Sequence, residues 1–593
     1  MGRNPALSRD QSTSPGRRYV LPADHGAYPI VAAIAVIVML LRCQLTIDVF
    51  NHTIDEPFHI AAAVGLYEAH KHVADVTHPP LAWLVAGIAL KHDGVDVPQL
   101  HGSKTVLDFT GMDQVASSAL FHQKAGYWRV LTDARKAMLV FPVIAMIYLY
   151  QLGKWLSSSL VAMLAVVFCS TDPTLLAHSG LVNNDVAACA AFLAGLYHGL
   201  RWLVTPTWGR ALVAGIALGL GVGTKFTVLV LFPSLLLIQL FRLLPVFWMH
   251  NLKHRWKTYF ARWPSVGQVA LCAAAGFVSL WSLYLFNIGP MQDQHFFDYT
   301  PKWNSIPAFV RGMPIPMPSF VLGLIYQVVH SQTGHQSYLN AIRYAHKGPV
   351  EFFFQSLLMK QTLAFIALVG TAAVAWLRMR PRRPWQSLLI VAPIVVYMTI
   401  STTGSIMIGI RHLLPIIPLM YLFGCFVLAR GRVTLLVIAL SAVSFIETLA
   451  LHPDYLPFMN IASGGPRRGL MFFADSNLDW GQDVARLATW LRASPQARNR
   501  PYTLRLFASN EAELLTELGL NPKAQTETPH GLFAISKSTR VGFTNFDPET
   551  NGLSSSPEDY SWLRFYPKIA EIGYGIEVYD LGEAPATNVA SAE

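Results

Sequence analysis

Charged residues are scarce in this chain. Asp, Glu, Lys and Arg make up only 13% of its 593 residues, whereas 53% of the residues are hydrophobic. A soluble domain carries roughly 25% charged residues, so this composition excludes an ordinary water-soluble enzyme. The aromatic content of 12% also excludes a disordered chain, because disordered segments are poor in aromatic side chains.

Cysteine pairs and nucleotide-binding motifs are lacking as well. The five cysteines lie in or beside apolar runs and form no CxxC pair, which excludes a disulfide framework and a cysteine metal site. They are Cys43, Cys169, Cys189, Cys272 and Cys425. No GxGxxG or P-loop motif stands between a predicted strand and a helix, so the sequence does not predict a nucleotide-binding fold.

Long apolar runs are abundant. A membrane-spanning helix needs about 20 mostly apolar residues, and the sequence contains about eleven such runs. They cover residues 28–46, 134–150, 160–176, 186–204, 211–223, 226–240, 266–288, 356–377, 387–400, 413–429 and 433–451. No small-residue cleavage site follows the first run, which is therefore predicted to be a retained signal anchor. The fold class predicted is a polytopic α-helical membrane protein.

Basic residues mark the predicted cytoplasmic loops. If the N-terminal tail, residues 1–27, lies in the cytoplasm, every even-numbered connection lies there too, and none of these connections contains Asp or Glu. Their basic residues are Lys154, Arg201, Arg210, Arg242, Lys253, Arg255, Lys257, Arg262, Arg378, Arg380, Arg382, Arg383, Arg430 and Arg432. This is a positive-inside pattern. The net charge of +10 therefore reports topology, and no nucleic-acid partner is predicted.

The same topology divides the chain into parts. Residues 28–451 form the predicted membrane domain, with two large outer segments at about 47–133 and 289–355. An odd number of spans places the polar tail, residues 452–593, outside the cell membrane. Its short β-like runs predict a small extracytoplasmic α/β domain.

The short outer connections hold few ionisable residues. They contain Asp185, Lys225, Arg411 and His412. One interpretation is that each side chain snorkels to the lipid headgroups. Ionisable groups at membrane helices are costly unless they are paired or used, so an acid and two bases on one face favour a site for a charged ligand.

The first outer segment begins with two adjacent carboxylates, Asp55 and Glu56. One of them could act as a general base beside an acceptor hydroxyl. The alternative is a helix start, where acids offset the macrodipole and where Pro57 suits the first turn. The segment is also rich in histidine, but Asp55-Glu56-x-x-His59 lacks the first histidine of the HExxH zinc motif. The sequence leaves open a divalent metal ion beside a phosphate.

Several of these motifs resemble a known family. Asp55-Glu56 followed by His78-Pro79-Pro80-Leu81 resembles the first outer loop of the protein O-mannosyltransferases. These belong to the GT-C glycosyltransferases, together with the lipid A aminoarabinose transferase and bacterial dolichyl-phosphate-mannose transferase-like proteins. The segments around Asp185, Lys225 and Arg411 continue the resemblance. In the tail, residues 475–483 resemble a segment of bacterial members, with contact to an acceptor, a lid or a structural turn as alternatives.

The resemblance implies a glycosyltransferase that moves a sugar, with inversion, from a polyprenyl-phosphate donor to an acceptor hydroxyl. Asp55 is then the base and Glu56 positions the acceptor or the base. Lys225 and Arg411 bind the donor phosphate, and substrate-binding or orienting roles fall to a further set of residues. That set is Asp185, His59, His78 and His412.

The acceptor is left open as a protein, a lipid or a glycan. The resemblance implies an integral protein of a bacterial inner membrane, surrounded by its lipids, with the active site outside. A transporter or a flippase for lipid-linked sugars is the alternative function. We see no duplicated halves of the kind that transporters usually show, and the acids gather at one face rather than in the middle of the membrane.

Overall fold

The computed structural model describes residues 26–103, 106–248, 263–291, 306–378, 384–521, 530–543, 546–547, 552–553 and 559–582. Nearly all of the predicted N-terminal tail lies outside these residues. The same holds for several of the basic loop residues on which the predicted topology rests, namely Lys253, Arg255, Lys257, Arg262, Arg380, Arg382 and Arg383.

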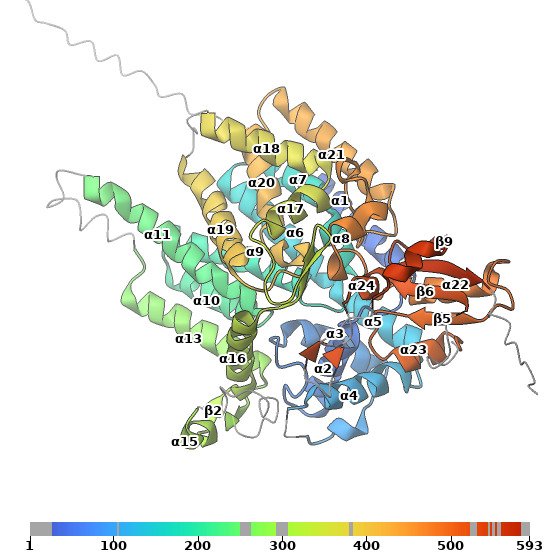
Figure 1. Ribbon diagram of the computed structural model, residues 1–593. Helices are drawn as coiled ribbons and strands as arrows, with labels where there is room; N and C mark the ends of the chain where they lie inside the picture. Colours follow the sequence, from blue (N-terminus) through green and yellow to red (C-terminus); the bar gives the residue numbers. More distant parts are fainter. Residues whose placement is uncertain are drawn as a thin grey trace, which may run out of the picture.

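Apolar helices dominate the structure (Figure 1). By length and composition, four helices of the described residues could each cross a membrane. They are Ala27–Ile47 (α1), Asp185–Val204 (α9), Val266–Leu283 (α13) and, within Pro384–Thr403 (α19), Trp385–Thr403. Two bent helix pairs raise this number to six if each pair is one span. The chain is a polytopic helical membrane protein, and the eleven spans stay a prediction.

The remaining apolar helices complete the bundle. They are Val140–Leu156 (α6), Ser159–Cys169 (α7), Pro173–Ser179 (α8), Trp208–Val222 (α10), Leu231–Trp248 (α11), Phe352–Lys360 (α17), Leu363–Arg378 (α18), Ile417–Leu428 (α20) and Val433–Leu449 (α21). Two short 3₁₀ helices, Phe226–Val230 (η2) and Ile410–Leu413 (η5), each lead into the following helix.

Two apolar runs that the sequence predicts as single helices are broken. The first becomes α7 and α8, bent by 68°, because Asp172 accepts a hydrogen bond from the Leu175 N–H and Pro173 starts the new helix. The second becomes α17 and α18, bent by 120°. The predicted span 134–150 is also displaced, since residue 134 belongs to an amphipathic helix that ends at Met138.

Exposed apolar side chains identify a surface suited to lipid. On α1, five of them recur every three or four residues, which places them on one helical face. They are Ile30, Ile34, Ile37, Leu41 and Leu45. Inside the bundle, α10 and α13 approach closely at glycine. A Cβ atom on Gly219 would lie 2.2 Å from the Gly276 carbonyl oxygen, as is typical of small residues between membrane helices.

The first outer segment folds into helices against the bundle. They are Glu56–Glu68 (α2), Leu81–His92 (α3), Phe109–Phe121 (α4) and Tyr127–Met138 (α5), with a 3₁₀ turn at Pro98–Leu100 (η1). The other outer segment contributes Ala308–Gly312 (α15), Pro318–Thr333 (α16) and two small hairpins. These hairpins pair Ile288–Gly289 (β1) with Ile315–Pro316 (β2), and Ser337–Leu339 (β3) with Ile342–Tyr344 (β4).

The C-terminal part contains a four-stranded sheet in the order β5-β6-β10-β9. Its strands are Tyr502–Arg505 (β5), Gly531–Ser536 (β6), Lys568–Ile572 (β9) and Ile576–Gly582 (β10). β5 runs parallel to β6, whereas β10 is antiparallel to both β6 and β9. The accompanying elements are Val484–Ala493 (α22), Glu511–Glu517 (α23), Lys537–Arg540 (α24) and the pair Phe546–Asp547 (β7) and Gly552–Leu553 (β8).

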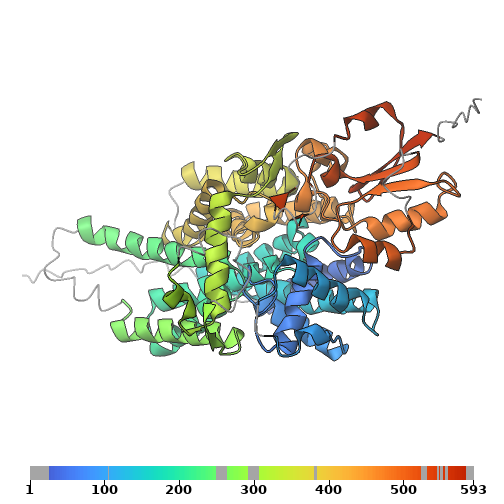
Figure 2. The ribbon, with the colours of Figure 1, turned by 60° about the horizontal axis from the view of Figure 1, so that its bottom comes forward.

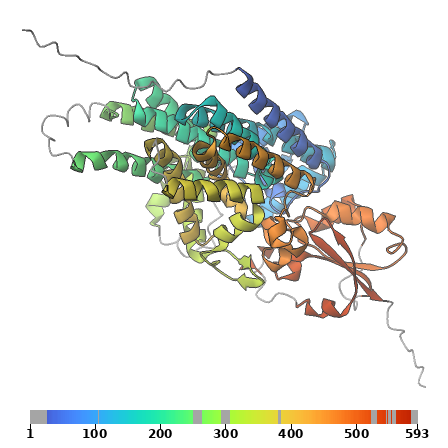
Figure 3. The ribbon, with the colours of Figure 1, turned by 90° about the horizontal axis from the view of Figure 1, so that it is seen from above.

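The sheet lies at one end of the molecule. In Figures 1, 2 and 3 it stands on the side opposite to the far ends of α11 and α13, and the helices of the first outer segment lie beside it. The chain just before α2 contacts the C-terminal part, since the Ile54 N–H donates to the Trp480 carbonyl.

Candidate active site

Four charged side chains from four separate segments meet at this end of the bundle. Asp55 precedes α2, Asp185 begins α9, Lys225 precedes η2 and Arg411 lies in η5. Lys225 Nζ is 2.6 Å from Asp185 Oδ1. Arg411 Nη1 is 3.4 Å from Asp185 Oδ2 and 3.5 Å from Asp55 Oδ2. We call these four residues the ion cluster, and they are four of the residues that the sequence singled out.

Exposure distinguishes the members of the ion cluster. The side chain of Asp55 is 37% exposed, whereas those of Asp185, Lys225 and Arg411 are 2%, 12% and 11% exposed. Asp185 is held by both cations and starts a helix, where a carboxylate also offsets the macrodipole. Asp55 has only the longer contact to Arg411. It is therefore the carboxylate of the cluster that a substrate can reach.

The C-terminal part supplies one wall of the site. The Arg411 guanidinium lies 4.2 Å from the ring centre of Trp480, and Arg411 Nε is buried without a hydrogen-bond partner. The Ile54 N–H donates to the Trp480 carbonyl at 3.0 Å, and Asn51 Nδ2 donates to the Gly481 carbonyl at 2.8 Å. The segment 475–483 thus fixes both the chain before Asp55 and the orientation of Arg411.

Asp475 adds a third acid beside the cluster. It is buried, and its backbone φ of +53° is unusual for a residue with a side chain. Burial raises the pKa of Asp475 to about 7, although the charge of Arg411 opposes this shift and Asp55 adds to it. From the sequence, acceptor contact was one alternative for the segment 475–483 as a whole, and neither Asp475 nor Trp480 was given a role of its own. A signal was present, because the tail segment 475–483 that contains both residues carries five further polar side chains.

Glu56 turns away from the ion cluster. It is fully buried, and its carboxylate accepts two hydrogen bonds from Arg135, at 2.8 and 2.6 Å. It also accepts from the N–H groups of Thr53 and Val182 at 2.8 and 2.9 Å. With both oxygens engaged, Glu56 ties the chain at Asp55 to the loop before Asp185.

His59 and His78 lie near Asp55 on the side of the first outer segment. The His59 ring stacks on Trp83 with 4.3 Å between ring centres, and the rings of His59 and His78 are 6.0 Å apart. Burial lowers the pKa of both histidines. Both rings are therefore neutral at pH 7.

His412 stands on the other side, next to Arg411. Its ring Nε2 is buried without a hydrogen-bond partner, and its carbonyl accepts from the Tyr397 hydroxyl at 2.9 Å. Burial, together with the charges of Lys225 and Arg411, lowers the pKa of His412 well below its ordinary value. A neutral ring is available there as a hydrogen-bond partner for a ligand.

Asp75 is a residue of this region that sequence reasoning missed. It lies three residues before His78, and its Oδ2 is 3.7 Å from His59 Nε2. Burial raises the pKa of Asp75 to about 8, while a hydrogen bond from Thr77 lowers it. No sequence motif predicts a role for Asp75, because its carboxyl reaches the histidines only through the turn before His78-Pro79-Pro80.

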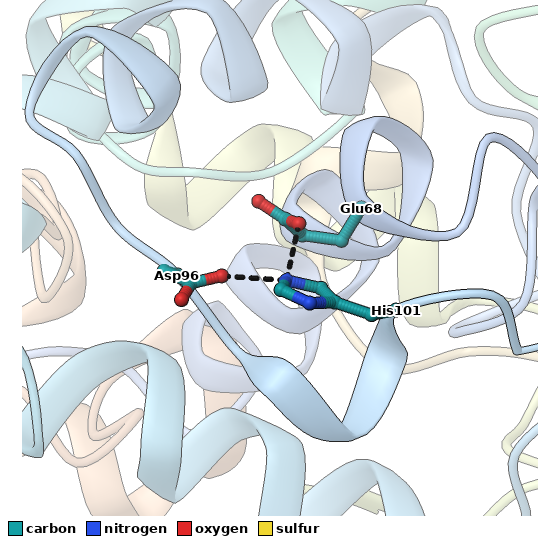
Figure 4. Close-up of side chains that lie close together, drawn as sticks. All are labelled: Glu68, Asp96 and His101. Carbon is teal, nitrogen blue, oxygen red and sulfur yellow. Dashed lines mark hydrogen bonds and ion pairs between the residues drawn. The ribbon is translucent and has the colours of Figure 1, made fainter.

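Another acid and histidine cluster lies on the first outer segment. His101 Nε2 is 2.8 Å from Glu68 Oε2 and 2.7 Å from Asp96 Oδ1 (Figure 4). Within the described residues, it is the group whose donor atoms could surround a metal ion. Glu68 ends the helix that Asp55 precedes, which puts it about 20 Å from Asp55 along the axis at 1.5 Å per residue. The group is separate from the ion cluster.

Comparison with known proteins identifies one family. Residues 129–284 match the family described as dolichyl-phosphate-mannose-protein mannosyltransferase. This match contains Asp185 and Lys225 and excludes Asp55 and Arg411. No curated protein sequence matches the chain significantly.

Three solved structures match the chain in structure comparison at low sequence identity. ArnT from Cupriavidus metallidurans bound to undecaprenyl phosphate is 12% identical, with a TM-score of 0.45 over 93% of this chain and 99% of its own. The S. cerevisiae O-mannosyltransferase complex Pmt1-Pmt2, bound to its sugar donor, is 10% identical, with a TM-score of 0.46 over 72% and 90%. The Archaeoglobus fulgidus oligosaccharyltransferase AglB, with an inhibitory peptide and a dolichol-phosphate, is 12% identical, with a TM-score of 0.39 over 85% and 61%.

The resemblance drawn from the motifs is thus confirmed over residues 129–284, which match the dolichyl-phosphate-mannose-protein mannosyltransferase family.

Proposed function

We propose that the protein transfers a hexose or a pentose, with inversion, from a polyprenyl-phosphate donor to a hydroxyl group of a protein, lipid or glycan. The reaction takes place on the extracytoplasmic side of a bacterial inner membrane. The family match supports a lipid-phosphate donor. The observation that carries the proposal is the ion cluster, in which one exposed carboxylate and two cations converge from separate segments.

Each member of the cluster has a role in this reaction. Asp55 takes the proton from the acceptor hydroxyl while the acceptor oxygen bonds to the anomeric carbon and the bond from that carbon to the phosphate oxygen breaks. Lys225 and Arg411 bind the phosphate and stabilise the charge that develops on it as it leaves. Removing one such stabilising group costs about 3 kcal/mol of barrier. Asp185 holds the two cations in place.

The buried groups around the cluster have positioning roles. Glu56 fixes the backbone on which Asp55 stands, through its contacts with Arg135 and Val182. Of the two roles that the resemblance left for Glu56, its burial favours positioning the base over touching the acceptor. His412 offers its buried Nε2 to the donor phosphate or to the acceptor.

The sidedness rests on the arrangement of the loops. The basic connection between α11 and α13 follows the positive-inside rule. The ends of these helices and the C-terminal sheet stand on opposite sides of the molecule (Figure 2). This supports an extracytoplasmic position for the sheet and for the ion cluster beside it.

A transfer assay tests the proposal. Purified protein in proteoliposomes is given radiolabelled undecaprenyl-phosphate mannose or arabinose and a detergent extract of the cell envelope, and label outside the donor fraction is measured. Wild type is expected to transfer label. Asp55→Asn is expected to fold but to lose about 10²–10⁴-fold in rate, the usual contribution of a general base.

Asp133→Asn is the matched control, because this acid lies on α5 and pairs with Lys136 at 2.7 Å, outside the site. Full activity of Asp55→Asn would remove Asp55 as the base. Movement of labelled donor across the bilayer without transfer would favour the flippase function instead.

A further inference from the structure

A chain of hydrogen bonds fixes the ring orientation of His78. The Thr77 hydroxyl donates to Asp75 Oδ1, and His78 Nδ1 is 2.8 Å from the same hydroxyl. Because the hydroxyl has given its proton to the carboxyl, it accepts from His78, which places the His78 proton on Nδ1. His78 Nε2 is then unprotonated and can accept a hydrogen bond. It has no partner among the residues that the structure describes.

The tautomer of His59 follows in the same way. His59 Nδ1 is 2.6 Å from the Val182 carbonyl, which can only accept, so Nδ1 carries the proton. His59 Nε2 is therefore also unprotonated and can accept a hydrogen bond. It faces Asp75 Oδ2 across 3.7 Å, a distance too long for a hydrogen bond.

Asp75 Oδ2 is itself buried without a hydrogen-bond partner. The side chain of Asp75 is only 9% exposed, and an unsatisfied polar atom at such burial is costly. The turn that aims it has a backbone φ of +47°, a conformation that is rare for residues other than glycine. Strained backbone of this kind is concentrated at functional sites.

This group adjoins the ion cluster. The charges of Asp55 and Lys225 both act on the pKa of Asp75, and Lys225 also lowers the pKa of His78. The His59 backbone N–H donates to the Asp55 carbonyl at 3.2 Å. A ligand whose phosphate lies at Lys225 therefore has the group directly beside it.

Hydroxyl groups fit this arrangement of atoms. Burial raises the pKa of Asp75 to about 8, so the carboxyl carries a proton at pH 7, and the free oxygen is Oδ2. A hydroxyl placed near Oδ2 and His59 Nε2 can accept from the first and donate to the second. A second hydroxyl can donate to His78 Nε2. A cation could accept nothing from a protonated carboxyl.

We propose that Asp75, His59 and His78 form a subsite that binds hydroxyl groups of the transferred sugar. The subsite rests on the proposed function, because it needs the donor phosphate at Lys225 and Arg411. It adds Asp75 as a residue that recognises the sugar, and it gives the two histidines a common task as hydrogen-bond acceptors.

Binding measurements with two kinds of probe test the subsite. Protein in detergent micelles is titrated with bare undecaprenyl phosphate and with undecaprenyl phosphate carrying mannose, glucose or arabinose. Wild type is expected to bind at least one of the sugar-bearing lipids more tightly than the bare lipid. In Asp75→Ala this preference should fall about tenfold, the equivalent of one hydrogen bond, while affinity for the bare lipid stays unchanged.

Two further variants separate recognition from folding. Asp75→Asn should keep the preference, because its amide N–H replaces the carboxyl O–H and Asn tolerates a positive φ. His59→Phe should lose the preference about tenfold while keeping the ring stacked on Trp83, so the test survives if Asp75→Ala does not fold. Asp133→Asn, remote from the site, should behave as wild type.

The outcomes separate the two proposals. A wild-type protein that prefers a sugar-bearing lipid, with the same preference in Asp75→Ala and His59→Phe, would overturn the subsite and leave the proposed function standing. A wild-type protein that prefers none of the sugar-bearing lipids would overturn the proposed donor and the subsite with it. A preference abolished by EDTA would show that a metal ion, rather than hydroxyl groups, occupies these atoms.

Discussion

Replacing the carboxylate by an amide should have different effects at the adjacent residues Asp55 and Glu56: it should reduce catalysis at Asp55 and stability at Glu56. Glu56→Gln replaces one carboxylate oxygen by an NH₂ group that points at the Arg135 guanidinium. Both side chains of this pair are 1% exposed, so the guanidinium is left buried with its charge uncompensated. Breaking such a pair on one side costs about 3–5 kcal/mol, whereas Asp55 is 37% exposed and loses only a long contact.

The measurement is the thermal unfolding midpoint in detergent, followed by the transfer assay on the folded fraction. Glu56→Gln should lower the midpoint by several degrees and reduce the yield of inserted protein. Asp55→Asn should melt within a degree or two of wild type and yet be inactive. The same change at neighbouring positions then gives a stability defect in one variant and a catalytic defect in the other.

One result would refute this division of roles. If Glu56→Gln melts like wild type and is inactive, its carboxylate contacts a substrate, and the Arg135 pair contributes little to folding. Loss of stability in Asp55→Asn would equally contradict the assignment, because it would make the exposed carboxylate a structural group.

Three further predictions follow from the contacts at the site. Trp480→Leu should weaken binding of undecaprenyl phosphate about 30-fold, because a desolvated cation–π contact with Arg411 contributes roughly 2 kcal/mol. Trp490→Leu changes a partly buried residue of α22 and serves as the control; equal affinities in both variants would count against the contact. Lys225→Ala and Arg411→Ala should each lower affinity for the same lipid, measured by titration, and unchanged affinity in both would exclude them as the phosphate site. The pKa of Asp75 is about 8 in the folded protein against an ordinary value of 3.8, so its contribution should lower the unfolding midpoint as the pH rises from about 4 to about 8, because the unfolded chain loses the proton first. Asp75→Asn should therefore stabilise the protein more at pH 8 than at pH 5. An equal effect at both pH values would contradict the raised pKa.

The ion cluster could be predicted because membrane segments tolerate few charges. Asp185, Lys225 and Arg411 stand out in connections that are otherwise apolar or neutral, and ionisable residues there are costly unless used. Each was identified from one short stretch of sequence. Their convergence needed only that the connections lie at the same end of the bundle, as the predicted alternation of spans requires.

The helix breaks and the walls of the site could not be predicted in this way. A hydropathy window measures how apolar a run is but not the direction of the chain, so it cannot detect the 120° bend between α17 and α18. Trp480 reaches Arg411 because the tail returns to the start of the chain, as in the contact between Asn51 and Gly481, which are 430 positions apart. No local pattern encodes a contact of that range.

The charges of the ion cluster couple the binding of the donor to the pairing of Asp55, the proposed base. The described cluster contains two carboxylates and two cations, so its formal charge is zero before the donor arrives. A sugar phosphodiester brings one negative charge and competes for the cations. Asp185 has a 2.6 Å contact with Lys225, whereas Asp55 depends on a single contact of 3.5 Å with Arg411.

Arg411 can turn toward a phosphate at little cost, because its Nε has no partner to lose and Trp480 supports the guanidinium through its ring face. Asp55 is the carboxylate that loses its cation in that movement. Under the proposed function, donor binding therefore releases the Asp55 carboxylate from its cation at the moment when an acceptor hydroxyl needs a base, and without a donor the same residue stays paired with Arg411.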